Sequence, residues 1–74
     1  MLKNDIGIDA GVIWHLLSEN GRLSVREIGE HTSYREGLIF MSLGWLAREN
    51  KIRILDIDGR LFAELDNVHN ETYY

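Results

Sequence analysis

Apolar residues recur at helical spacing up to about residue 50 of this chain and alternate with polar residues from residue 52 to residue 65. The first stripe follows the spacing i, i+3, i+4 and i+7, which predicts a helix with one face toward a core. Its members are Ala10, Ile13, Trp14 and Leu17. Asp9 suits the N-cap, and Gly21 suits the left-handed residue that ends a helix. We therefore expect the first helix to run from about Asp9 to Asn20.

Two capping boxes of the form S-x-x-E follow this helix. In such a box the serine oxygen accepts a hydrogen bond from the N3 amide, and the glutamate accepts one from the amide of the cap. Ser24 with Glu27 predicts the start of a short helix over residues 25–31, and Ser33 with Glu36 predicts the start of the next helix. Only a tight turn remains between the two helices, which is typical of a helix-turn-helix.

A third helix is expected from about residue 34 to residue 49. Ile39, Leu43 and Leu46 make one apolar stripe on it, and Leu38, Met41 and Trp45 make a second stripe on another side. We expect Trp14 and Trp45 to anchor the core. Gly37 and Gly44 each cost about 1 kcal/mol relative to alanine inside a helix, so we expect close packing at both positions. Asn50 suits the left-handed position that follows a helix.

Asp58-Gly59 stands between two alternating apolar runs and predicts a β-hairpin. This pair is the strongest short-range hairpin signal, because the tight turn needs a positive φ at both central residues. With these two residues as the turn, the expected pairs are Ile57–Arg60, Leu55–Phe62, Ile54–Ala63, Arg53–Glu64 and Ile52–Leu65. The opposite charges of Arg53 and Glu64 support this register.

A brief strand is expected at residues 22–24, so the predicted order of elements is helix, strand, helix, helix and two strands. This order indicates an α+β fold of the winged helix-turn-helix type. Such a domain is a three-helix bundle with a small antiparallel sheet, whose hairpin forms the wing. We place this domain at residues 1–66 and expect residues 67–74 to form a polar, frayed tail.

Two segments of the chain carry a resemblance to a known family. They are AGVIW at residues 10–14, with Leu17, and LGWLARENKI at residues 43–52. From about Ile6 to Leu65 the chain resembles a family of small, stand-alone bacterial winged helix-turn-helix domains without an established function. The resemblance implies three helices and a small sheet, in the style of bacterial winged-helix regulators. It implies no catalytic or binding residues, because none are agreed for the family.

The formal charge of the chain is −4 at pH 7. Residues 21–50 carry four arginines and four glutamates, while residues 1–20 and residues 51–74 each sum to −2. No segment is strongly basic, which argues against tight non-specific binding to DNA. The chain contains no cysteine, so it has neither a disulfide nor a thiolate metal site. It also lacks a long apolar run and a signal-peptide core, so we expect a cytoplasmic protein without membrane contact.

Binding of double-stranded DNA, as in a transcription regulator, is the first functional hypothesis. In winged helices the third helix enters the major groove and the wing contacts the backbone. The candidate contacts are Arg26, Ser33, Tyr34, Arg35 and Arg60. Ser33 and the free amides at the start of the third helix are expected to hold a phosphate. Between Arg35 and Arg48, however, the helix has no Arg, Lys, Asn or Gln, so its middle lacks the usual readers of guanine and adenine.

A protein-interaction module, either a homodimer or an adaptor, is the alternative hypothesis. Only one face of the wing packs against the helices, so Leu55, Ile57 and Phe62 are candidates for an exposed apolar patch on the other face. Val12 and Leu16 form a separate stripe on the first helix. That stripe is either part of a wide buried face or a subunit contact. The sequence leaves both functions open.

We predict no enzymatic activity, no cofactor, no metal site and no small-molecule ligand. The three histidines, His15, His31 and His69, are scattered without the spacing of metal ligands. Ser24 and Ser33 are accounted for as caps, and no G-x-S-x-G motif exists. Residues 56–59 resemble only the start of a calcium loop and lack its later acidic ligands.

Overall fold

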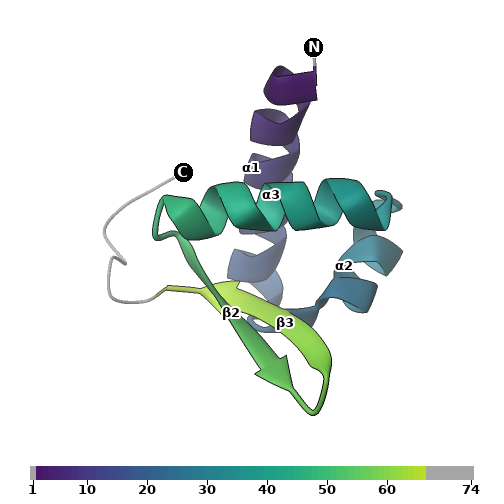
Figure 1. Ribbon diagram of the computed structural model, residues 1–74, viewed down its shortest axis with the longest axis vertical. Coiled ribbons are helices and arrows are strands. Elements are labelled where there is room, and N and C mark those ends of the chain that lie inside the picture. The colour runs from purple at the N-terminus through teal and green to yellow at the C-terminus, as the bar shows by residue number, and fades with distance from the viewer. Residues whose placement is uncertain (1, 67–74) are drawn as a thin grey trace.

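The computed structural model describes residues 2–66, which form three helices and one three-stranded sheet. The elements are α1 (Leu2–Asn20), β1 (Leu23–Ser24), α2 (Val25–Thr32), α3 (Glu36–Arg48), β2 (Ile52–Ile57) and β3 (Arg60–Leu65). Their order and arrangement confirm the predicted winged helix-turn-helix fold, with the β2–β3 hairpin as the wing (Figure 1). The predicted tail, residues 67–74, lies outside the described residues.

α1 begins at Leu2, so the predicted start near Asp9 is wrong. Asp9 lies inside the helix and does not cap it. The additional turns contact α3, because a Cβ added to Gly7 would lie 3.8 Å from Cζ2 of Trp45. In Figure 1, α1 runs behind α3 and continues past it. This tertiary contact favours a longer helix than the local capping signal indicates. The predicted end is confirmed, since Gly21 has φ +79°.

Ser24 caps α2 as predicted. Its Oγ accepts a hydrogen bond from the Glu27 amide at 3.0 Å, and the Ser24 amide donates to Oε1 of Glu27 at 2.8 Å. The bond from the Ser24 amide is the main reason why the pKa of Glu27 lies below its ordinary value of 4.5. Both halves of this capping box are therefore present.

The second predicted capping box, Ser33 with Glu36, is wrong. Ser33 adopts the left-handed conformation that ends α2, with φ 62° and ψ 18°. Its amide donates to the carbonyl four residues earlier at 2.7 Å. An N-cap needs extended backbone, and Arg35 occupies that position without a side-chain hydrogen bond. α3 therefore begins two residues later than the sequence predicts.

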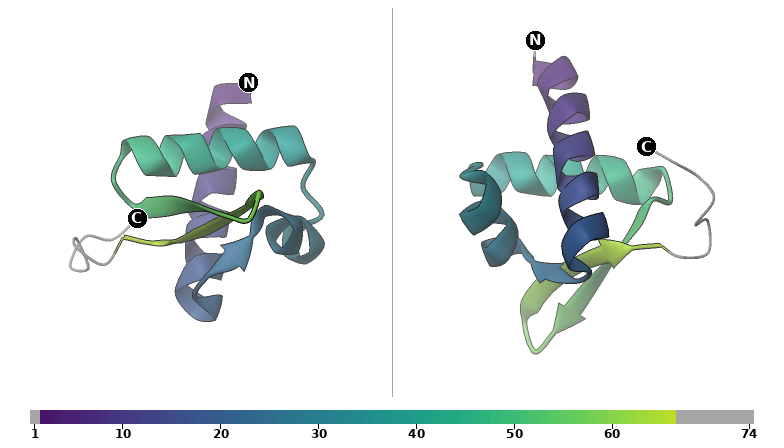
Figure 2. Two further views of the ribbon diagram at one scale, coloured as in Figure 1. Left: turned by 60° about the horizontal axis from the view of Figure 1, so that its bottom comes forward. Right: turned by 180° about the vertical axis from the view of Figure 1, so that it is seen from behind.

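The core combines one stripe from each helix with the inner face of the sheet. Its most deeply buried residues are Ala10, Ile13, Leu17, Ile28, Ile39, Leu43, Leu46, Ile52 and Ala63. They include the predicted stripe of Ile39, Leu43 and Leu46 on α3. Trp14 and Trp45 are half-buried and pack against this cluster instead of filling its centre. The left view of Figure 2 shows α3 crossing α1 and lying over the wing, so α3 contacts both layers.

The sheet has the strand order β1-β3-β2 and is antiparallel throughout. Every predicted pair of the hairpin is confirmed: Ile57–Arg60, Leu55–Phe62, Ile54–Ala63, Arg53–Glu64 and Ile52–Leu65. Asp58 and Gly59 have φ values of 53° and 83°, as the tight turn requires. Oδ1 of Asp56 accepts a hydrogen bond from the Gly59 amide at 3.0 Å, which further fixes the turn.

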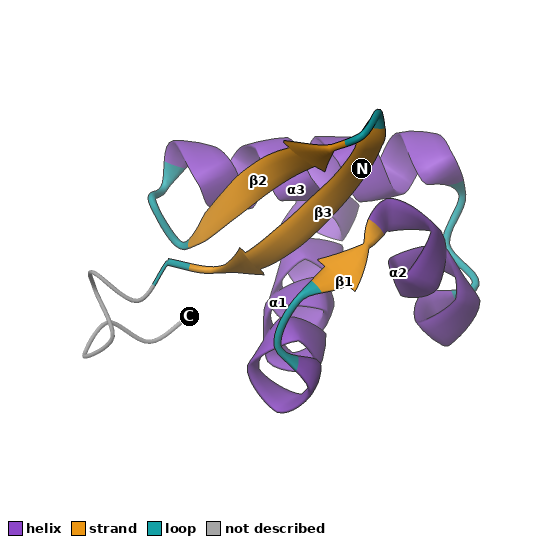
Figure 3. Ribbon diagram, turned by 90° about the horizontal axis from the view of Figure 1, so that it is seen from below, coloured by secondary structure: helices purple, strands orange, loops and turns teal. Residues whose placement is uncertain are grey.

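Glu64 links two arginines on the outer face of the sheet. No described helix lies in front of this face in Figure 3. Its carboxylate accepts hydrogen bonds from Nε of Arg22 at 3.0 Å and from Nη2 of Arg53 at 2.6 Å. The Arg53 contact is the predicted cross-strand pair. The hydrogen bond from Arg22 is the main reason why the pKa of Glu64 lies below its ordinary value of 4.5.

Substitution of the two serines at the ends of α2 distinguishes the predicted cap that forms, Ser24, from the one that does not, Ser33. We expect Ser24→Ala to lower the free energy of unfolding by about 1 kcal/mol, because it removes the acceptor for a helix amide. Ser33→Ala removes no cap, so we expect a change of roughly a few tenths of a kcal/mol. Urea denaturation measures both values. An equal loss at both positions would contradict the assignment of Ser33 to the end of α2.

The depressed pKa of Glu64 gives the fold a pH dependence. Its ion pairs stabilise the folded state above the unfolded pKa, and this contribution is lost as the pH falls through the lower folded pKa. We expect Glu64→Gln to lose less stability than the wild type between about pH 6 and about pH 3 in urea titrations. Glu30→Gln is the matched control, because its pair with Arg26 spans 3.6 Å between well-exposed side chains. Equal acid slopes for the wild type and Glu64→Gln would contradict the role of these ion pairs.

Candidate macromolecule-binding faces

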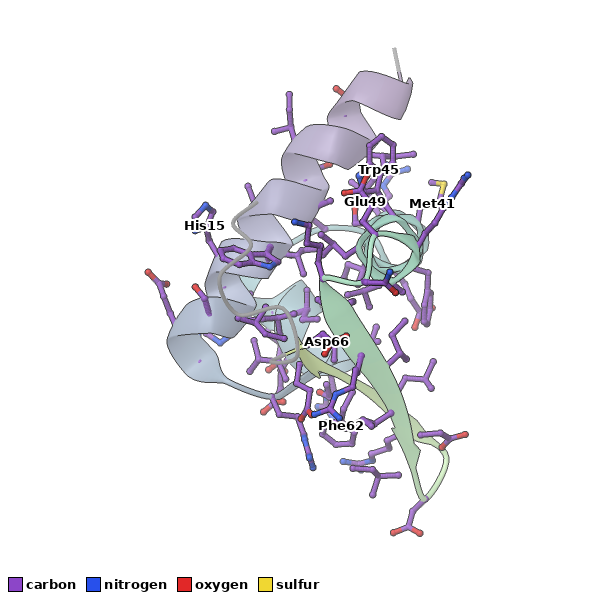
Figure 4. All side chains as sticks on the ribbon, turned by 90° about the vertical axis from the view of Figure 1, so that its left-hand side faces the viewer. His15, Met41, Trp45, Glu49, Phe62 and Asp66 are labelled. Atoms are coloured by element: carbon purple, nitrogen blue, oxygen red, sulfur yellow. The ribbon has the colours of Figure 1, made fainter. Side chains whose placement is uncertain are left out.

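The outward side of α3 is apolar at its centre. We call the residues Gly37, Phe40, Met41 and Gly44 on that side the α3 outer face. Phe40 is 42% exposed and Met41 is 44% exposed. In Figure 4, Met41 points away from α1, whereas Trp45 lies on the side of α3 toward α1. Two large apolar side chains therefore stand next to each other in solvent on the helix that a winged helix uses for recognition.

The two glycines of this face have no close neighbours. A Cβ added to Gly37 or Gly44 would meet no heavy atom within 4 Å among the described residues, so the prediction of close packing at these positions is wrong. The reason is that both lie on the solvent side of α3, opposite the buried stripe. Each still costs about 1 kcal/mol relative to alanine in a helix interior. Packing within residues 2–66 does not explain this cost.

Opposite charges stand together at each end of α3. Arg35 and Glu36 are at its start, and Arg48 and Glu49 are at its end. All four side chains are exposed, and none forms an ion pair with another residue in the part of the chain described here. α3 therefore has an apolar outer face at its centre and an arginine next to a glutamate at each end, so that each end is electrically balanced.

A cleft of about 560 Å³ opens between α2, the start of α3 and the tip of the wing. Three of the five predicted DNA contacts line it, namely Arg26, Tyr34 and Arg60. The fold thus brings Arg60 of the wing next to Arg26 of α2 and Tyr34 of the turn after α2. Ser33 and Arg35 do not line this cleft, and Ser33 ends α2 instead of starting α3, so its predicted place at the amides of α3 is wrong.

The charges around this cleft are partly compensated. Nε of Arg26 lies 3.6 Å from a carboxylate oxygen of Glu30, and Glu36 also lines the cleft. Burial, followed by a hydrogen bond with the Asp9 carboxylate, raises the pKa of Tyr34 above 10.0. The Tyr34 hydroxyl therefore lies close to α1 and stays protonated at neutral pH. The cleft does not form a strongly positive surface.

The five predicted interface residues fall in two separate places. Leu55 and Phe62 are half-buried partners on the outer face of the sheet, and Ile57 beside them is 39% exposed. On α1, Val12 is 44% exposed, whereas Leu16 is half-buried and packs against the core. Of the two residues in the α1 stripe, Leu16 thus belongs with the core and Val12 with the surface.

Sequence reasoning missed the α3 outer face as an apolar surface. The second predicted stripe groups Met41 with Leu38 and Trp45, although only Met41 of the three is exposed. Phe40 falls on neither predicted stripe. Its position was therefore the sequence signal for an apolar side chain on the solvent side of α3. A large apolar residue outside both stripes of a helix is expected on its solvent side.

No helix within residues 2–66 combines the length and the apolar composition needed to cross a bilayer. In the same range, no three His, Asp or Glu side chains are grouped closely enough to bind a metal ion. His15 and His31 are exposed on α1 and α2, and His69 lies outside the described residues.

Comparison with known proteins confirms the predicted resemblance. Residues 1–65 match the family described as "Winged helix-turn-helix domain (DUF2582)". The solution NMR structure of protein BT2368 from Bacteroides thetaiotaomicron aligns with a TM-score of 0.80 and 30% identity, over 100% of this chain and 89% of that chain. HlyU from Vibrio cholerae N16961 shares the fold, with a TM-score of 0.65 and 20% identity over 86% of this chain and 75% of its own. The uncharacterized protein MJ1608 from Methanocaldococcus jannaschii is 40% identical over 63 residues, which are 81% of this chain and 89% of that protein.

Proposed function

Because this chain belongs to the winged helix-turn-helix domain family DUF2582, we propose that it is a recognition module that uses α3 to bind a protein surface. The winged-helix fold presents the third helix and the hairpin to a partner. Fold alone does not determine which partner is bound, so the side chains on α3 must decide between nucleic acid and protein.

The composition of the α3 outer face carries this proposal. Direct readout of bases uses Arg, Lys, Asn and Gln side chains in the major groove, and the α3 outer face has none of these. It offers Phe40 and Met41, two residue types that are enriched at protein interfaces. Gly37 and Gly44 on either side of them leave the backbone open to close approach.

The charge of the chain supports a protein partner as well. Binding to a polyanion draws mainly on the neutralisation of phosphates, and this chain has a formal charge of −4. Residues 56–60 at the tip of the wing contain Asp56, Asp58 and Arg60, so their formal charge sums to −1. A protein surface requires no such excess of positive charge.

Photo-crosslinking at position 40 tests the proposed function. We expect p-benzoylphenylalanine in place of Phe40 to form adducts with protein in cells of the native host, because this side chain lies in the proposed contact. The same residue in place of Ser18, an exposed position on α1, is the control and should form far fewer adducts. Mass spectrometry identifies the products. Adducts with nucleic acid alone, or no enrichment over position 18, would contradict the proposal.

Duplex DNA is the second candidate partner, and a specific observation favours it. Arg26 on α2 and Arg60 on the wing line one cleft beside the start of α3, where a winged helix contacts the phosphate backbone. These arginines would position the domain on DNA without reading its sequence, since phosphate contacts carry no sequence information.

Fluorescence anisotropy with a mixed-sequence duplex at low salt tests this second candidate. If DNA binds through the cleft, Arg60→Gln should weaken binding and reduce the slope of log affinity against log salt by about one. Arg53→Gln is the matched control, because it removes the same charge from the outer face of the sheet, away from the cleft. No binding at low salt, or an equal loss of DNA affinity in the two variants, would rule out the cleft as a DNA-binding site.

A further inference from the structure

The cleft between α2, the start of α3 and the tip of the wing has an apolar base. Val25 and Ile39 line it and also belong to the buried core, and Leu61 of the wing packs against that core. Gly29 lines the cleft as well and adds no side chain to it. The volume of about 560 Å³ lies within the range of about 300 to about 1,000 Å³ that ligand-binding clefts occupy. The cleft therefore offers room and an apolar surface to a large side chain of a partner.

Phe40 connects this cleft with the α3 outer face, because it belongs to both. Its side chain is 42% exposed. A protein that contacts the α3 outer face at Phe40 thus also lies beside the cleft. The cleft and the α3 outer face can therefore bind the same partner.

The cleft has a weakly positive lining in a chain of negative charge. Its charged residues are Arg26, Arg60 and Glu36, so the lining sums to +1, and the two aspartates of the wing tip do not line it. Arg60 forms no ion pair within residues 2–66. The pair of Arg26 with Glu30 joins two well-exposed side chains and contributes little. Both guanidinium groups are therefore available to bind a carboxylate through paired hydrogen bonds.

We propose that the cleft binds a short acidic segment of the protein partner. One large apolar side chain of this segment enters the cleft, and carboxylates on either side of it bind Arg26 and Arg60. Glu36 disfavours a carboxylate at the start of α3, so the acidic groups of the segment lie toward α2 and the wing. This inference rests on the proposed function and names the chemistry of the partner.

Duplex DNA matches the cleft less well than such a segment does. DNA carries one negative charge for about every 1.7 Å of its axis, and its binding depends on an excess of cations that a lining of +1 does not supply. Phosphates bound to the two arginines would also leave the apolar base of the cleft uncovered. An acidic segment with one large apolar residue matches both the charge and the apolar base.

Two other clefts do not favour a negatively charged partner. The groove between α1 and the second half of α3 is lined by Arg48 and Glu49, whose charges balance. The cleft between α1 and α2 is lined by Glu19 and by no arginine or lysine. Of these three places, the cleft between α2, α3 and the wing is the one whose charge favours an acidic segment.

Peptide selection on the full 74-residue chain tests the inference. The probe is a phage-displayed library of short random peptides. We expect the enriched peptides to combine one aromatic or large aliphatic residue with Asp or Glu on both sides of it, because the cleft joins an apolar base to two arginines. Enrichment of basic or uncharged peptides, or no enrichment, would overturn the inference.

Fluorescence anisotropy with the most enriched peptide then locates its binding site. Arg26→Gln and Arg60→Gln should each weaken binding by about threefold to about tenfold, because each removes a charged hydrogen-bond donor. Arg48→Gln is the matched control, since it removes the same charge from the other end of α3, and binding should stay within about twofold of the wild type. Serine in place of the apolar residue of the peptide should weaken binding by about tenfold or more. Equal losses for the three arginine variants would overturn the assignment to this cleft.

A charge exchange between peptide and protein tests the contact with Arg60. Lysine is placed in turn at each acidic position of the peptide, and each exchange should weaken binding to the wild type. At one position, the variant Arg60→Glu should restore binding to within about threefold of the original pair. Such a rescue requires direct contact between the two groups, and its absence at every position would contradict the proposed contact.

Gly29→Leu tests the cleft without unfolding the chain. The new Cβ would lie 3.5 Å from Cδ1 of Ile39, which is an ordinary contact, and leucine is favoured over glycine inside a helix. The melting temperature should therefore not fall. The leucine side chain fills the cleft, so peptide binding should be lost. A stable Gly29→Leu variant that binds the peptide like the wild type would overturn the inference.

The outcomes separate this inference from the proposed function. Protein adducts at position 40 that form equally in the double variant Arg26→Gln/Arg60→Gln would overturn the acidic segment and leave the protein-binding function standing. No enriched peptide and no protein adduct at position 40 would overturn both. Duplex binding that depends on Arg26 and Arg60, without any enriched peptide, would assign the cleft to DNA and overturn the inference.

Discussion

The burial of one stripe of α3 determines the arrangement of the other surfaces. Ile39, Leu43 and Leu46 are at most 2% exposed and join the core residues of α1 and of the inner face of the sheet. Turning α3 about its axis would expose this stripe, at a cost of about 2 kcal/mol for each large side chain. The orientation of the helix is therefore fixed. Phe40 and Met41 face solvent because the opposite side of α3 is occupied by the core.

The parts of the fold that obey short-range rules could be predicted from the sequence. The hairpin depends on two adjacent residues with positive φ, and Asp58-Gly59 is the pair that tolerates this conformation best. Once that two-residue turn is placed, every residue pair between β2 and β3 follows from it. The capping box of Ser24 and Glu27 is likewise a contact within one turn of chain. Such features need no knowledge of the tertiary structure.

The remaining features depend on contacts that local patterns do not contain. α1 extends to Leu2 because its first turns lie against Trp45, which is distant in sequence. Ser33 has the residue type and spacing of a cap, but the chain uses it to end α2. For the candidate site, the sequence identified three of the residues that line the cleft, namely Arg26, Tyr34 and Arg60. The outward direction of Met41 became evident only with the helix in place, because the periodicity alone groups Met41 with the half-buried Leu38 and Trp45.

The folded domain thus presents an apolar helix face where winged helices place their recognition residues, because the opposite stripe of α3 is buried in the core. A soluble paramagnetic agent, which broadens the NMR signals of exposed side chains, measures this orientation of α3 directly. We expect strong broadening for the Phe40 ring and the Met41 methyl group and little for the methyl groups of Ile39, Leu43 and Leu46. Strong broadening of the signals of Ile39, Leu43 and Leu46, with protected Phe40 and Met41 signals, would contradict this account.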